Sequence, residues 1–126
     1  PLGGGFVVKR GGLAVKRHGD WVSIFSSAPN LPSCLLRAVA KFAGVHIYSD
    51  ADDVVYANES LLCIHARHAG KRRIKLPGAC DVVDAWTGKV IARRAREFEV
   101  YLRGAETGMW WLTKTEGEGK AWREKS

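Results

Sequence analysis

The chain has 126 residues, 46% of them hydrophobic, and a formal net charge of +7. This length corresponds to one domain, or to a small domain with part of another, and it allows a core that needs no disulfide or metal. No run approaches the 18 apolar residues of a transmembrane helix, so we expect no membrane partner.

Three cysteines, Cys34, Cys63 and Cys80, share no C-x-x-C spacing. An odd number argues against a complete disulfide framework and favours a reducing, cytoplasmic compartment. Each cysteine has apolar neighbours in the sequence, so we expect all three to be buried as small hydrophobic side chains.

The first 48 residues predict a hairpin, a strand and a helix. Gly11-Gly12 separates Phe6–Val8 from Leu13–Val15, which predicts a tight hairpin, because glycines accept the positive φ of such turns. Gly19-Asp20 predicts the next turn, and residues 21–25 the next strand.

A helix is expected over residues 31–43, because apolar side chains recur there at helical spacing: Leu35, Leu36, Val39, Phe42 and Ala43. Asn30 is a candidate N-cap, and Gly44 is placed to end the helix. Residues 45–48 read as a strand, so the order strand, helix, strand is a candidate βαβ crossover.

From residue 49 onward, short β-rich runs alternate with turn signals such as Pro77-Gly78 and Thr87-Gly88. The resulting prediction is a mainly β (α+β) fold: an antiparallel β-sandwich of about 8–10 short strands, with the amphipathic helix 31–43 packed on it. We expect three parts: residues 1–48, which resemble the end of an α/β domain, the sandwich over 49–115, and a mobile tail over 116–126.

No catalytic or metal-binding motif stands out. The cluster Asp50, Asp52 and Asp53 lacks the glycine and glutamate of a calcium loop, so a turn is the simpler interpretation. His65 and His68 have no third ligand in view. Asp81/Asp84 and Glu97/Glu99 are candidate carboxylate pairs of the glycosidase type. Because Glu97 and Glu99 lie near Arg93, Arg94 and Arg96, surface ion pairing is the simpler explanation for the second pair. We therefore expect no catalytic residue, no metal and no cofactor.

The chain has an unusually high number of tryptophans, five in 126 residues, and these are the most informative residues for a binding site. Trp110 and Trp111 must face opposite sides of a strand, so one is expected in the core and the other outside. An exposed indole offers a stacking surface for a sugar ring or for a neighbouring domain. The candidate ligand-binding residues are Trp86, Trp110 and Trp111, with core packing or interdomain contact as the simpler explanation.

The positive charge suggests a second hypothesis, a nucleic-acid-binding module. In it, one electropositive face would bind phosphates while tryptophans stack on bases. Its candidate residues are Lys71, Arg72, Arg73, Arg93, Arg94 and Arg96.

Three stretches resemble the C-terminal region of beta-galactosidase-like bacterial glycoside hydrolases. SSAPNLPSCLLRAVAKFAGVHIYSD is similar to the last helix and strand of their α/β domain, and DDVVYANESLLCIHA to the entry of their terminal sandwich. Leu76-Pro77 followed by DVVDAWTG, and then Glu106-Thr107, resemble that sandwich itself. The resemblance implies a module without catalytic residues that follows a catalytic barrel.

The leading functional hypothesis is therefore a non-catalytic accessory or assembly module of a carbohydrate-active enzyme. Its expected partners are neighbouring enzyme domains and glycans. The alternative is a basic, β-rich nucleic-acid-binding module.

Overall fold

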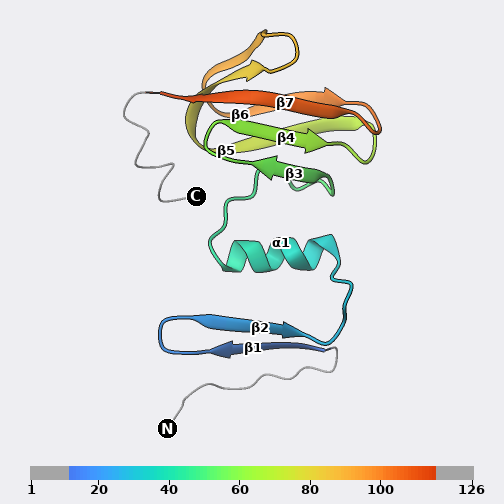
Figure 1. Cartoon of the computed structure of the whole chain (residues 1–126), viewed down its shortest axis with the longest axis vertical. Helices are drawn as coiled ribbons and strands as arrows, with labels where there is room; N and C mark the ends of the chain where they lie inside the picture. Colours follow the sequence, from blue (N-terminus) through green and yellow to red (C-terminus); the bar gives the residue numbers. More distant parts are fainter. Residues whose placement is uncertain (1–11, 116–126) are drawn as a thin grey trace. The chain divides into compact units, whose positions relative to one another are not determined.

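A computed structural model describes residues 12–115, which are mainly β: seven antiparallel strands in two sheets with one short helix (Figure 1). The chain divides into two compact units, Pro1–Leu36 and Arg37–Ser126, which are described separately. The elements in order are β1 (Leu13–Arg17), β2 (Val22–Ser26), α1 (Ser33–Phe42), β3 (Val54–Ala57), β4 (Leu61–His65), β5 (Gly70–Asp84), β6 (Val90–Leu102) and β7 (Thr107–Lys114).

The first unit contains the antiparallel hairpin β1–β2, in which Leu13 lies opposite Ser26. The His18 amide donates to the Trp21 carbonyl (2.8 Å) across the turn, and the two rings stack at 3.7 Å. The predicted turn at Gly19-Asp20 is thus confirmed. The other predicted hairpin needs Phe6–Val8, which lie outside the described residues, as does the predicted tail over 116–126.

The predicted helix is present as α1, but it begins later than expected. The Pro32 carbonyl accepts the first helical bond, from the Leu36 amide (3.1 Å), so Pro32 and not Asn30 is in the cap position. Gly44 ends the helix as predicted: its φ is +76°, and the Val45 amide bonds back to the Ala40 carbonyl. No residue of α1 is buried, and within the second unit its residues Arg37 and Lys41 form ion pairs with Asp52 and Asp50.

The predicted strand at residues 45–48 is wrong, and with it the βαβ crossover. These residues have no strand assignment, and β1 and β2 pair antiparallel with each other. The Tyr48 carbonyl accepts a bond from the Lys75 amide (2.8 Å), and the His46 Nε2 atom lies 2.9 Å from the Lys75 carbonyl oxygen. The segment therefore lies beside β5 without being a strand.

The second unit is a five-stranded antiparallel sheet with the order β3-β4-β7-β5-β6. Its two long strands explain why seven strands replace the eight to ten expected. Pro77-Gly78 was predicted to be a turn, but β5 continues through it. The basic residues that follow Ala92 also suggest a turn in the sequence, but β6 continues through Arg93-Arg94. Both positions are irregularities in the β5–β6 register, where extra residues bend a strand without ending it.

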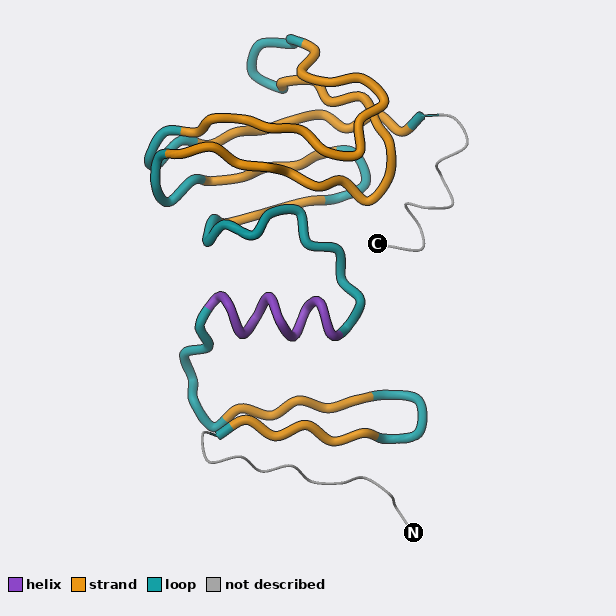
Figure 2. The backbone as a smooth tube through the Cα atoms, turned by 180° about the vertical axis from the view of Figure 1, so that it is seen from behind, coloured by secondary structure: helices purple, strands orange, loops and turns teal. Residues whose placement is uncertain are grey.

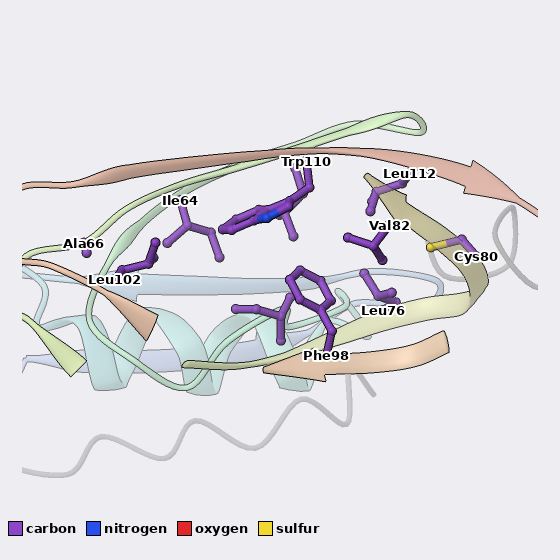
Figure 3. Packing of buried hydrophobic residues seen from close by; sticks show 11 residues of the cluster. Ile64, Ala66, Leu76, Cys80, Val82, Phe98, Leu102, Trp110 and Leu112 are labelled. Atoms are coloured by element: carbon purple, nitrogen blue, oxygen red, sulfur yellow. The ribbon is translucent and has the colours of Figure 1, made fainter. Parts of the chain in front are cut away.

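The bend in β5 encloses the core. Its first half, up to Lys75, pairs with β6, whereas Cys80–Asp84 lie between β6 and β7. Seen from behind in Figure 2, the strands curl around a common interior. Figure 3 shows side chains from several strands of this sheet meeting in that interior, which holds Leu62, Ile64, Ala66, Ile74, Leu76, Cys80, Val82, Phe98, Leu102, Trp110 and Leu112.

Trp110 is the largest side chain in this core, with 1% of its surface exposed. Its ring meets Phe98 edge to face at a centroid distance of 5.4 Å (Figure 3). The ring also covers Gly108, where a Cβ atom would lie 2.2 Å from Cη2 of Trp110. Residue 108 therefore has to be glycine for the indole to lie where it does.

We predict that Gly108→Ala lowers the free energy of unfolding by about 2 kcal/mol, because the added methyl group overpacks the core against the indole. Urea denaturation measures this loss. Gly104→Ala is the matched control, because the nearest atom to its Cβ would be 3.7 Å away. Equal stabilities for the two variants would contradict the packing described for Trp110.

Candidate functional site

Trp111 lies on the outer face of the five-stranded sheet, the face opposite the core. Because neighbouring side chains on a strand alternate, burial of Trp110 turns Trp111 outward, with 51% of its surface exposed. Leu61 of β4 and Val83 of β5 lie directly opposite it on either side. The prediction that one tryptophan of this pair lies in the core and the other outside is confirmed.

A shallow depression of about 430 Å³ lies beside Trp111, here called the Trp111 depression. Its lining combines the indole with groups that can hydrogen-bond to hydroxyls: Glu59, Ser60, Trp111, Leu112, Thr113 and Lys114. The Lys114 Nζ atom lies 3.1 Å from Glu59 Oε2, so the cation and the carboxylate hold each other at the edge of the depression.

The β3–β4 turn positions Glu59 and Ser60. The Asn58 carboxamide oxygen accepts bonds from the Ser60 amide (2.9 Å) and the Leu61 amide (2.8 Å), which fixes the turn. The Leu112 amide then donates to the Ser60 carbonyl (2.8 Å), tying this turn to β7. No local pattern in the sequence points to Glu59, Ser60, Thr113 and Lys114, because only the β4–β7 register brings the two segments together.

Trp86 is separate from this depression. It occupies the β5–β6 turn with 66% of its surface exposed, and its Nε1 atom donates to the Thr107 carbonyl (3.3 Å). The Asp84 carboxylate organises the turn by accepting the Thr87 and Trp86 amides (2.9 Å each), and these bonds lower the pKa of Asp84. Of the three candidate tryptophans, Trp111 lines the Trp111 depression, whereas Trp110 is buried in the core and Trp86 lies in the β5–β6 turn.

The candidate basic residues do not all point outward, because Arg72 is buried. Lys71 and Arg73 lie outward on β5, where Lys71 pairs with Glu99 (3.0 Å) and Arg73 with Glu97 (2.6 Å). The Arg73 hydrogen bonds lower the pKa of Glu97. The Glu97/Glu99 pair thus makes surface ion pairs, as expected, although its partners are on β5 and not on its own strand.

Arg72, between these two, points inward. Its side chain is 9% exposed and forms a two-bond ion pair with Asp53, whose side chain is 2% exposed, at 2.5 and 3.1 Å. Its guanidinium also donates to the His68 carbonyl (2.6 Å). Hydrogen bonding from Arg72 lowers the pKa of Asp53, so this carboxylate is charged over the whole neutral range.

The remaining candidate bases lie on the first half of β6. The Arg93 Nη1 atom is 3.6 Å from Asp81 Oδ2, and the Arg94 amide donates to Asp81 Oδ1 (2.7 Å). Arg96 is exposed and has an interaction partner of its own.

The acidic cluster at residues 50–53 is divided among basic partners. Asp50 pairs with Lys41 and Lys75, and Asp52 with Arg37. Together with the Asp53–Arg72 pair, these contacts account for all three carboxylates as structural groups. Within residues 12–115 no cluster of three histidine, cysteine or carboxylate side chains is arranged to hold a metal ion.

The expectation that all three cysteines are buried is wrong for two of them. Cys34 is exposed on α1 and Cys63 is half-buried, while Cys80 is buried and burial raises its thiol pKa to about 11. Apolar sequence neighbours could not reveal this, because Cys63 faces outward between the buried residues Leu62 and Ile64.

No protein-family model, no curated protein and no solved structure matches this chain. Among the helices of residues 12–115, none is long and apolar enough to span a membrane.

We predict that Asp53→Asn lowers the free energy of unfolding by about 3 kcal/mol at pH 7, because the Arg72 charge is left buried without its partner. Since folding lowers the pKa of Asp53, the native pair contributes its full stability above the ordinary carboxyl pKa of about 3.9. That contribution is lost as the pH falls toward the lower pKa of the folded state.

The stability difference between the parent protein and Asp53→Asn should therefore shrink as denaturation is repeated from pH 7 down to pH 3. Asp52→Asn is the matched control, since the Asp52 side chain is 58% exposed and its pair with Arg37 contributes little. A difference that stays constant with pH would contradict the role given to the Asp53 carboxylate.

Proposed function

We propose that this chain is a non-catalytic carbohydrate-contacting module that accompanies a carbohydrate-active enzyme. The observation that carries the proposal is the Trp111 depression: an exposed indole on a rigid sheet, bordered by a carboxylate, an ammonium group and hydroxyl groups. Sugars present an apolar face of C–H groups and a rim of hydroxyls, and both parts find a partner in such a site.

The support of Trp111 favours this role. Its strand is central in the sheet, with β4 on one side and β5 on the other, so the indole is carried on a backbone paired along both edges. A platform held in this way loses little conformational freedom on binding, which is how preorganised sites gain affinity.

Two features favour a binding role over a catalytic one. The Glu59 carboxylate pairs with Lys114 at 3.1 Å, and its oxygens can accept hydrogen bonds from hydroxyls. Glu97 and Glu99 were the candidate carboxylate pair on β6, and the Glu97 carboxylate forms an ion pair with Arg73. The resemblance to the C-terminal region of beta-galactosidase-like hydrolases is consistent with a module of this kind, and a neighbouring enzyme domain is its second proposed partner.

We predict that Trp111→Ala lowers the affinity for neutral oligosaccharides, such as galacto- or xylo-oligosaccharides, at least tenfold, because one stacking platform is removed. Isothermal titration calorimetry measures the change. Trp111→Phe keeps an aromatic face and should retain part of the affinity. Trp86→Ala removes a more exposed indole outside the depression and should bind as the parent does.

Absence of binding to any galactoside or xyloside would remove the glycan-contacting role. Binding that survives Trp111→Ala and is lost in Trp86→Ala would move the site to the β5–β6 turn.

A further inference from the structure

The outer face carries a second feature, a bulge in β6 opposite Asp81. Cys80 pairs with Ala95 and Val82 with Ala92, so the single residue Asp81 faces two residues, Arg93 and Arg94. The bulge holds Arg94 at a φ of +46°, an uncommon conformation for a residue with a side chain. Such irregularities change the direction of side chains and are frequent next to binding sites.

The effect of the bulge is to bring two arginines together. Consecutive residues of a regular strand face opposite sides of the sheet, but here Arg93 and Arg94 line one depression of about 380 Å³, together with Asp81 and Thr115. Asp81 is bound to both, through the Arg94 amide (2.7 Å) and the Arg93 guanidinium (3.6 Å). The two arginines and the single carboxylate give this bulge depression one net positive charge.

The bulge depression and the Trp111 depression share the outer face. Across the β5–β7 ladder, Val83 lies opposite Trp111 and Asp81 lies opposite Thr113. Asp81 and Trp111 are therefore diagonal neighbours, about 7 Å apart in an antiparallel pair. Thr113, which lines the Trp111 depression, lies opposite Asp81 and two positions from Trp111 on β7. One disaccharide can reach both positions.

We propose that the ligand of this face is an anionic oligosaccharide, in which one sugar ring stacks on Trp111 and the carboxylate or sulfate of its neighbour binds Arg93 and Arg94. This inference rests on the proposed glycan-contacting function and narrows its ligand class. Arginine suits the role, because its planar fork of N–H groups matches the paired oxygens of a carboxylate or a sulfate.

The test compares an oligogalacturonate with its neutral methyl ester and with a sulfated galacto-oligosaccharide, titrated calorimetrically into the full chain. The acid or the sulfate ester should bind at least tenfold more tightly than the methyl ester, as expected for charge-assisted bonds. Whichever of the two binds more tightly identifies the anionic group. The preference should weaken as salt is raised, since Arg93 is 72% exposed.

Arg93→Gln/Arg94→Gln should abolish the preference and leave the binding of the methyl ester unchanged. Arg103→Gln is the matched control: it removes an exposed arginine from the other end of β6, where Leu102 pairs with Gly70, and should keep the preference.

Equal affinity of the unmodified chain for the acid, the sulfate and the ester would overturn the inference while leaving the proposed function intact. Failure of all three ligands to bind would instead remove the proposed function. If Arg103→Gln lost the preference for the anionic sugar as fully as the double variant does, the preference would come from the overall charge of the protein. That result would overturn the binding site proposed at Arg93 and Arg94. A random single-stranded oligonucleotide that binds more tightly than either anionic sugar, and depends on Arg93 and Arg94, would overturn it in favour of nucleic-acid phosphates.

Discussion

Burial of the Trp110 indole is the contact on which the second unit depends. The ring lies over Gly108, meets Phe98 from β6, and leaves 1% of its surface in water. A tryptophan removes about 200 Å² from water, a contribution of about 5 kcal/mol at 25 cal/mol/Å² before conformational entropy is counted. The position of Trp110 also determines which side chains of β7 point into the core. Because Trp110 points inward, Trp111 must lie on the outer face.

The same constraint of alternation links core to surface along β5. Val82 is fully buried, so Asp81 and Val83 face outward, and the β5–β7 register then sets them beside Thr113 and Trp111. Packing in the interior thus determines which polar and aromatic side chains meet outside. The ion pairs serve a different purpose: Asp53–Arg72 holds the segment before β3 to the first half of β5, and Glu97–Arg73 ties β5 to β6.

Local sequence patterns predicted the mainly β class, the helix that ends at Gly44 and the β1–β2 turn. They also predicted that one of Trp110 and Trp111 is buried and the other exposed. They failed where the outcome depends on partners distant in sequence. Pro77-Gly78 and Arg93-Arg94 look like turns locally, yet pairing with neighbouring strands carries the backbone through them as bends. Glu59 and Lys114 are 55 positions apart, so their meeting beside Trp111 has no local signal.

We propose that the outer face around Trp111 and Thr113 is the binding surface of the protein. Amide chemical-shift mapping by NMR during titration with an oligosaccharide tests it most directly. The claim predicts that the shifts concentrate on residues 58–61 and 111–115, with Asp81, Arg93 and Arg94 added when the sugar is anionic. Shifts concentrated instead on Lys71, Arg73, Glu97 and Glu99, on the opposite half of β5 and β6, would contradict it.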